Sequence, residues 1–228
     1  ITNIDLAYGL YNNGGTVTIT GGTINAQAQT KAYGVHVKGN TTVTDAVVNA
    51  TTTRTTIADA FYVTAADKTL TINSGVFTTS TTTTAGYAIE ATAAATVNVN
   101  GGKFKSTTKT VSNTGSAAIQ LNAGFYDTDT ELAGYASPKQ VVALTTEPEK
   151  AEGYNYKIVD NAHQITFKNE DGTVVLQQSN IEDGVQPVYF GEAQTKASTP
   201  KYSYSFDGWK DASDNQVYTD AELPAVSK

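Results

Sequence analysis

The side chains with the clearest capacity for chemistry in this sequence recur at one position of successive repeats. That position is occupied in turn by Tyr11, His36, Tyr62, Glu90 and Ser112. On adjacent strands of a sheet, outward-pointing rings could stack on sugar rings, and Glu90 could accept hydrogen bonds from hydroxyl groups. We call such a set of equivalent residues, one from each repeat, a file. This file predicts a carbohydrate-binding strip at Tyr11, His36, Tyr62 and Glu90. Aromatic stacking that only stabilises an exposed sheet is the competing explanation.

A second file, three positions earlier in each repeat, holds Tyr8, Tyr33, Asp59 and Tyr87. Its positions share the strand parity of the inward-pointing residues, so we expect a packed stack at a corner of the fold. Asp59 and Glu90 lie in adjacent repeats, but they are three positions out of register and of opposite parity. Because a glycosidase needs two carboxylates that face each other across a groove, we do not expect this pair to form one.

Other signs of catalysis or metal binding are weak. The chain has no Cys, and its two His residues, His36 and His163, lie in different predicted domains. No Ser occupies a Gly-x-Ser-x-Gly elbow, although the members of a Ser/His/Asp triad can be far apart in sequence. A polysaccharide lyase would need carboxylates for calcium and a basic residue beside them, and Arg54 is the single Arg of the repeats. We therefore expect no catalytic residue, no metal and no cofactor, with a polysaccharide lyase or hydrolase as the enzymatic alternative.

Five segments of the N-terminal half align with one another and would supply the strands that carry these files. They are Val17–Ile24, Thr41–Val48, Leu70–Phe77, Val97–Phe104 and Ile119–Tyr126. A second motif precedes each segment, centred on Leu10, Val35, Phe61, Ile89 and Val111. Counted from Ile19, the segments repeat after 24, 29, 27 and 22 residues. Short alternating strands with this period predict a parallel β-helix of about five coils, because each coil buries its apolar face only against its neighbours.

Three files of equivalent residues support this architecture. Two inward files would stack apolar side chains from coil to coil. Their members are Ile19, Val43, Ile72, Val99 and Leu121 in the first file, and Ile24, Val48, Phe77, Phe104 and Tyr126 in the second. A third file ends in Asn73, Asn100 and Asn122, which predicts a ladder of side-chain amide hydrogen bonds between coils.

The pattern Ile/Val-x-Gly-Gly-x-Ile/Phe is clearest at Ile19–Ile24 and Val99–Phe104. It resembles the right-handed parallel β-helices of bacterial polysaccharide lyases and cell-surface adhesins. The resemblance covers residues 1–126 and implies the fold, but it does not choose among the functions that this fold supports.

Residues 127–160 break the repeat and are predicted to form a cap over the end of the β-helix. Such an end exposes unpaired backbone groups and apolar side chains. Val141–Leu144 and Tyr156–Val159 are expected to pair as strands. The stretch also resembles the ends of surface β-helices, in which a Gly-Tyr turn, here Gly134–Tyr135, leads into an outgoing strand.

Residues 161–228 form a different predicted domain. Alternating residues on both sides of the Asp-Gly pair at 171–172 indicate a β-hairpin. Further strands are expected at Val185–Tyr189 and Tyr202–Phe206. We expect an aromatic core that contains Trp209, Tyr202, Tyr204 and Phe206. A cluster of exposed aromatic residues there would instead mark an interface.

Five stretches of this domain closely resemble the Listeria–Bacteroides repeat, the family that includes the internalin B-repeat. They are Ile165–Lys168, Asp171–Leu176, Gly184–Pro187, Thr195–Thr199 and Tyr202–Trp209. The resemblance implies a compact β-grasp-like module that acts as a spacer or interaction domain on bacterial surface proteins. Gln194 stands where the family commonly has Pro, and the family usually continues into one more strand. A truncated repeat, followed by further repeats in the parent chain, is therefore expected.

Charge is distributed unevenly, and the distribution excludes some partners. The net charge is −7, with +2 on residues 1–126 and −9 on residues 127–228. An acidic second half without clustered Lys and Arg argues against nucleic acid and against anionic membrane surfaces. No apolar run approaches the roughly 20 residues of a membrane span, so no membrane insertion is expected.

Together these observations predict an all-β chain, with a right-handed parallel β-helix at residues 1–126, a cap at 127–160 and a small β-grasp-like repeat domain at 161–228. We expect a non-catalytic, extracellular module of a bacterial cell-surface or secreted protein that acts as an adhesin or spacer. Its expected partners are a glycan or a host or cell-surface protein. Carbohydrate binding by the β-helix itself is the alternative function.

Overall fold

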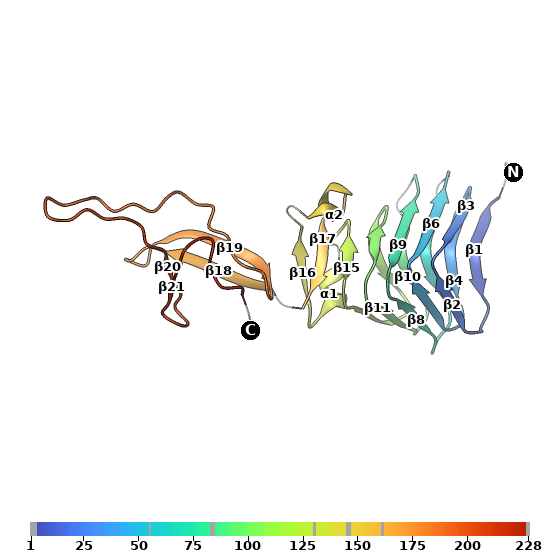
Figure 1. Cartoon of the computed structure of the whole chain (residues 1–228). Coiled ribbons are helices and arrows are strands. Elements are labelled where there is room, and N and C mark those ends of the chain that lie inside the picture. Colours follow the sequence, from blue (N-terminus) through green and yellow to red (C-terminus); the bar gives the residue numbers. More distant parts are fainter. Residues whose placement is uncertain are drawn as a thin grey trace. The chain divides into compact units, whose positions relative to one another are not determined.

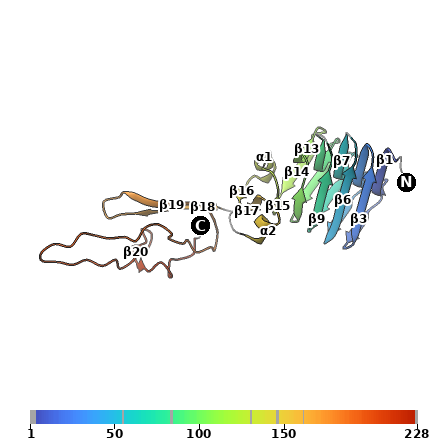
Figure 2. The same ribbon diagram turned by 90° about the horizontal axis from the view of Figure 1, so that it is seen from above.

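A computed structural model describes residues 4–54, 56–82, 85–129, 131–144, 147–160 and 162–226. The chain divides into two compact units, residues 1–159 and residues 160–228. Almost all regular structure in the described residues is β. Figure 1 shows the strands of the first unit stacked coil upon coil, and Figure 2 shows the same stack from above.

The first unit is a parallel β-solenoid in which successive coils add strands to three sheets. The first sheet contains β1 (Leu6–Asn12), β4 (Lys31–Val37), β7 (Ile57–Val63), β10 (Gly86–Ala91) and β13 (Lys109–Asn113). The second contains β2 (Val17–Thr20), β5 (Thr41–Thr44), β8 (Thr69–Ile72), β11 (Thr96–Val99) and β14 (Ala118–Leu121). The third contains β3 (Thr23–Ala28), β6 (Ala46–Thr52), β9 (Gly75–Ser80), β12 (Lys103–Lys105) and β15 (Gly124–Tyr126). The repeat thus produces the parallel β-helix that it predicts.

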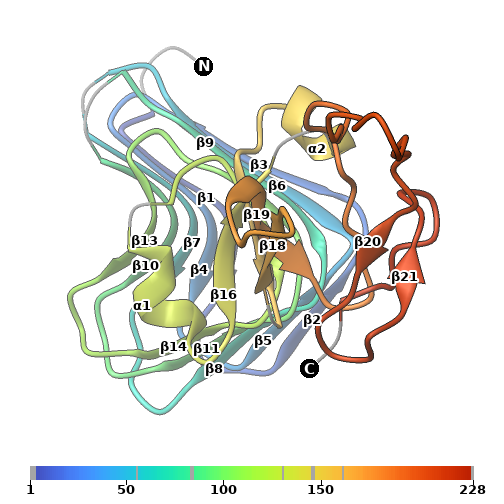
Figure 3. The same ribbon diagram turned by 90° about the vertical axis from the view of Figure 1, so that its left-hand side faces the viewer.

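The solenoid is right-handed. Figure 3 views it from its C-terminal end, where the chain passes counterclockwise from the first sheet to the second and then to the third while it advances toward the viewer. A right-handed coil is the hand that right-twisted parallel strands favour when a connection returns to the same sheet.

Both predicted inward files are present and fill the solenoid. Neighbouring members of each file are register partners in adjacent coils. The second file becomes an aromatic stack, with ring centroids 4.9 Å apart for Phe77 and Phe104 and 5.1 Å apart for Phe104 and Tyr126. The buried hydroxyl of Tyr126 donates to the carbonyl oxygen of Ala123 at 2.8 Å. Each such ring contributes about 1.5–3 kcal/mol by its burial, without an unpaired polar atom.

The predicted Asn ladder is present where the second sheet ends. Asn122 Nδ2 donates to Asn100 Oδ1 at 3.0 Å, and Asn100 Nδ2 donates to Asn73 Oδ1 at 3.1 Å. Asn73 Nδ2 donates to Thr44 Oγ1 at 3.2 Å. Polar side chains therefore link four coils outside the apolar core.

The segment after the last coil extends the third sheet. β17 (Tyr156–Val159) pairs antiparallel with β15 and with β16 (Gln140–Ala143). The strand pair predicted in the cap is therefore confirmed. β17 occupies the open edge of β15 in the antiparallel direction, so the parallel stacking of the third sheet ends at β15.

Two short helices, α1 (Leu132–Ala136) and α2 (Pro148–Ala151), belong to the same segment. The predicted Gly-Tyr turn at Gly134–Tyr135 is wrong, since both residues lie inside α1. The reason is apolar burial: Leu132 and Ala136, one helical turn apart, are fully buried in the solenoid core and close its end. Among the described residues, no helix has the length and apolar composition that a membrane crossing requires.

The second unit contains two two-stranded antiparallel sheets in its described residues. One is the hairpin of β18 (Ala162–Lys168) and β19 (Val174–Glu182), and the other pairs β20 (Trp209–Lys210) with β21 (Val217–Tyr218). The Asp-Gly turn of the hairpin forms as predicted, with the Gly172 N–H donating to the Asn169 carbonyl oxygen at 2.9 Å.

The strands predicted at Val185–Tyr189 and Tyr202–Phe206 are wrong, because neither segment joins a sheet. An alternating pattern becomes a strand only where another strand supplies backbone partners. The predicted core is also incomplete, since Tyr202, Tyr204 and Phe206 are exposed. Trp209 instead packs against the rings of Tyr189, Phe167 and Phe206, at centroid distances of 4.6–5.2 Å.

Candidate functional site

The predicted file from Tyr11 to Ser112 is present on the first sheet. Each member is the register partner of the next, across β1, β4, β7, β10 and β13. Val35 and Val37, on either side of His36, are fully buried in the core. Because side chains alternate along a strand, His36 points away from the core, and its file lies on the outer surface of the solenoid.

The second file lies on the same outer surface, because the strands of the first sheet are kinked. In β7, both Ala60 and Phe61 are fully buried in the core, so two successive residues face inward. Asp59 and Tyr62, on either side of this pair, consequently both face outward. The predicted packed stack is present for Tyr8 and Tyr33, whose rings stack at 5.5 Å between centroids. Its expected inward direction is wrong, because strict alternation does not hold across the kink.

Small residues make the kink possible. Gly34 occupies the position of Ala60 in the preceding coil, where a Cβ atom would lie 2.3 Å from Val48 Cγ1 and 2.7 Å from the Ala60 carbonyl oxygen. Gly9 is equally crowded by Ile24, at 2.4 Å from its Cγ2. Two inward residues in succession therefore fit only when the first of them is small.

Tyr8, Tyr11, Tyr33, His36 and Tyr62 form one continuous cluster, the outer aromatic face. Tyr8 contacts His36 of the next coil at 5.2 Å between ring centroids, and Tyr33 contacts Tyr62 of the next coil at 4.3 Å. Tyr11 and His36 lie 4.7 Å apart. Tyr8 and Tyr11 are 41% and 45% exposed, whereas Tyr33 and His36 are 5% exposed. The face therefore has a buried layer that supports exposed rings, which can stack on a ligand.

His36 is a neutral ring in the middle of this face. Its Nε2 lies 2.7 Å from Thr64 Oγ1, and its buried Nδ1 has no hydrogen-bond partner among the described residues. Burial, with a smaller effect of Lys38, lowers the pKa of His36 to about 4. Lys38 lies at the rim, where its Nζ is 5.5 Å from the centroid of Tyr11 in a cation–π contact. At neutral pH, His36 therefore adds no charge to the face.

Asp59 lies beside Glu90 at the edge of the outer aromatic face. The kink turns Asp59 outward, onto the side of the sheet that carries Glu90. Asp59 is fully buried, and its Oδ1 accepts a hydrogen bond from the Tyr87 N–H at 3.3 Å. Burial and the adjacent Glu90 raise the pKa of Asp59 far above its ordinary value.

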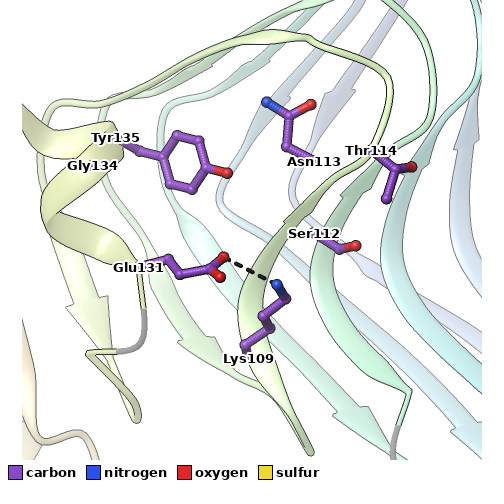
Figure 4. Close-up of a pocket in the computed structure, with 7 residues that line it drawn as sticks. All are labelled: Lys109, Ser112, Asn113, Thr114, Glu131, Gly134 and Tyr135. Carbon is purple, nitrogen blue, oxygen red and sulfur yellow. Dashed lines mark hydrogen bonds and ion pairs between the residues drawn. The ribbon is translucent and has the colours of Figure 1, made fainter.

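The last coil of the first sheet opens into a pocket of about 550 Å³ between β13 and α1. Lys109 and Ser112, which continue the two outer files, line its strand side. Figure 4 shows Glu131 and Tyr135 extending from the helix side toward this strand. Lys109 Nζ is 3.0 Å from Glu131 Oε2, so the cation of the pocket is already paired. Sequence patterns gave no sign of this pocket, because one of its walls is the unpredicted helix.

A larger cavity, of about 1230 Å³, lies in the second unit. Phe167, Phe206 and Trp209 contribute to its lining, and Lys196 pairs with Glu170 at 3.0 Å. Three of the four aromatic residues expected in a core, Tyr204, Phe206 and Trp209, thus line a partly open cavity, which is the arrangement expected of an interface.

No group of three or more His, Asp or Glu side chains that could hold a metal ion occurs among the described residues. In comparisons with known proteins, no family model, no curated protein and no solved structure matches the chain. The geometry of the outer aromatic face is therefore the basis for inferring function.

Proposed function

We propose that this chain is a non-catalytic adhesive module of a bacterial cell-surface or secreted protein, and that its solenoid binds carbohydrate through the outer aromatic face. The observation that carries the proposal is the continuity of that face. Five rings from three successive coils contact one another in one cluster. Exposed rings supported in this way offer flat apolar surfaces to sugar rings, with polar groups beside them for hydroxyls.

The backbone beneath the face favours binding without a change of shape. β4 is paired along its length with β1 on one side and β7 on the other, in parallel register. A surface that is ordered before the ligand arrives loses little conformational entropy on binding. This rigidity suits an adhesin, which has to hold its ligand while the parent protein is under load.

The geometry of Asp59 and Glu90 also favours binding over hydrolysis. Retaining glycosidases hold their two carboxyl groups about 5–5.5 Å apart, and inverting ones about 6.5–9.5 Å apart. Here Asp59 is fully buried, so its carboxyl group cannot face Glu90 across an open groove that holds a sugar. Reducing-end and unsaturated-product assays on plant and host polysaccharides should therefore detect no product. Product formation that Glu90→Gln abolishes would replace the binding role with a catalytic one.

A glycan array followed by calorimetry tests the proposal. We expect the array to identify bound glycans, and Tyr11→Ala to weaken their binding about tenfold or more, because an exposed stacking ring is lost. Tyr204→Ala is the matched control, since Tyr204 is 43% exposed in the second unit. An array without any bound glycan, or equal effects of the two variants, would refute the proposal.

We also propose that the second unit is a repeat of the Listeria–Bacteroides type that acts as a spacer. The β18–β19 hairpin with its Asp-Gly turn and the ring cluster around Trp209 support this assignment. Such a module packs its hairpin on the aromatic cluster, so Trp209→Ala should reduce the hydrogen-exchange protection of β18 and β19 while the solenoid amides keep theirs. Unchanged protection of the hairpin would show that the unit is not one packed module.

A further inference from the structure

We propose that the pocket between β13 and α1 is a terminal subsite of the carbohydrate-binding face, which receives the end residue of a glycan chain while the following residues lie along the outer aromatic face. This inference rests on the proposed binding function and specifies its ligand, which is a chain end and not a stretch within a polymer. It follows from the position of the pocket on the sheet, the wall that closes it and the groups that line it.

The pocket lies on the outer surface of the first sheet, in line with the aromatic rings. Ser112 is the register partner of Glu90, and Glu90 is the register partner of Tyr62. Ser112 and Lys109 line the pocket, so the two outer files lead from the aromatic face directly into it. A glycan that extends along the files from Tyr62 therefore passes Glu90, which can accept hydrogen bonds from its hydroxyls, and reaches the pocket.

The helix α1 closes the pocket at the end of the first sheet. β13 is the last strand of that sheet, and Figure 4 shows the helix beyond it, with Tyr135 and Glu131 extending back toward the strand. Leu132 and Ala136 are buried in the solenoid core and hold the helix in this place. A chain that follows the files is therefore stopped by α1, and only its end residue fits between the helix and β13.

The groups that line the pocket match the hydroxyls of a sugar. Lys109 and Glu131 form an ion pair at 3.0 Å, and their side chains are 26% and 50% exposed, so both can still reach a ligand. The hydroxyls of Ser112 and Tyr135 make no hydrogen bond to another described residue. A sugar hydroxyl both donates and accepts, so it can bond to the ammonium, the carboxylate and these two hydroxyls. The volume of about 550 Å³ is that of a site for a small molecule.

The distance from the pocket to the far end of the aromatic face sets the length of the best ligand. Tyr11 and Ser112 are separated by four coil steps, which correspond to about 19 Å. A pyranose residue is about as long as one such step. We therefore expect the affinity for linear oligomers to increase up to about five residues and then to stay constant.

Stoichiometry on a polymer tests the inference, because a protein that binds chain ends occupies one site per chain whatever the chain length. The probes are linear glucose and galactose hexamers and the soluble polymers of the same linkages, together with any other linear glycan that the array identifies. We expect calorimetry to give one bound protein per hexamer and one per polymer chain. Several proteins bound to each polymer chain would show that the face binds internal residues, and would overturn the terminal subsite.

Single hydroxyls of the pocket provide a second test. Ser112→Ala and Tyr135→Phe each remove one lining hydroxyl and should weaken hexamer binding about fivefold. Ser80→Ala is the matched control, because Ser80 is exposed at the end of β9 in the third sheet, and it should leave the affinity unchanged. If both pocket variants bind like this control, the inference is overturned even when Tyr11→Ala still weakens binding and the binding function stands. Absence of binding to every probe overturns both.

Discussion

The solenoid and the second unit both carry strictly alternating segments, yet only the solenoid turns them all into strands. Val97–Val99 and Tyr202–Phe206 have similar patterns, but the first is paired on both sides and the second joins no sheet. The difference is repetition. In the solenoid, every coil offers the next coil a strand edge for hydrogen bonds and apolar side chains in matching register. The sequence of the second unit does not repeat in this way. Alternation indicates a strand only when the sequence also supplies its neighbour.

The largest expected effect concerns the core files. Phe77→Ala removes a fully buried ring between Phe61 and Phe104 and should lower the free energy of unfolding of the solenoid by about 3–5 kcal/mol. Phe206→Ala, at a ring that is 47% exposed, should cost less than about 1 kcal/mol. Trp209 is the single Trp, so its fluorescence reports the second unit while circular dichroism reports mainly the solenoid. Similar losses for both variants would remove the contrast between the two units.

The kink of the first sheet should be the next most sensitive feature. Gly34→Ala places a Cβ atom against Val48 and the backbone of Ala60, so we expect a loss of about 1–3 kcal/mol in urea denaturation. Gly134→Ala is the matched control, because an added Cβ meets nothing within 4 Å there and Ala favours the helix. If Gly34→Ala is as stable as the wild type, close packing at Gly34 does not maintain the kink that places both outer files on one face.

The buried Asp59 side chain predicts that the free energy of unfolding falls as the pH rises. The folded-state pKa of Asp59 is raised, so the folded chain binds a proton that the unfolded chain has released, and stability is lost as the pH rises. His36, with its pKa lowered to about 4, acts oppositely and adds stability between about pH 4 and 6.5. Above about pH 6.5 only the Asp59 effect remains, at up to about 1.4 kcal/mol per pH unit. Denaturation of the wild type and Asp59→Asn at pH 6.5 and 8 measures it, and parallel curves for the two proteins would contradict the raised pKa of Asp59.

The smallest effect concerns the Asn ladder. Asn100→Ala removes two exposed side-chain hydrogen bonds and should cost about 1 kcal/mol. The side chain of Asn98, in β11 just before Asn100, makes no hydrogen bond in the described residues, so Asn98→Ala should change stability by less than about 0.5 kcal/mol. Equal changes in melting temperature for the two variants would mean that the hydrogen bonds of the ladder do not stabilise the solenoid.

The sequence predicted correctly those features that follow from the stacking of equivalent residues in successive coils. Stacking of like residues placed Tyr11 beside His36, Phe77 beside Phe104, and the Asn residues in their ladder. It failed at the kink, because the inward pair Ala60–Phe61 depends on how tightly the third sheet packs against it, which no local pattern reveals. The outward position of Asp59 was missed for the same reason, since its cause is the kink and not the spacing of the residues.

The helix α1 and the pocket beside it were missed for a different reason. Five residues are too few to show a helical period, and the helix forms because Leu132 and Ala136 have an exposed core end to cover. Tertiary burial decides such a segment. Lys109 and Glu131 could be recognised as pocket residues only after that helix was in place.

Chemical-shift mapping tests the central claim most directly. Backbone amide spectra recorded during titration with a neutral oligosaccharide should show shifts concentrated in β1, β4, β7 and β10, which carry the outer aromatic face and Glu90. The amides of residues 160–228 should keep their positions. Shifts confined to the second unit, or spread over the second and third sheets of the solenoid, would contradict the assignment of the first sheet as the binding surface.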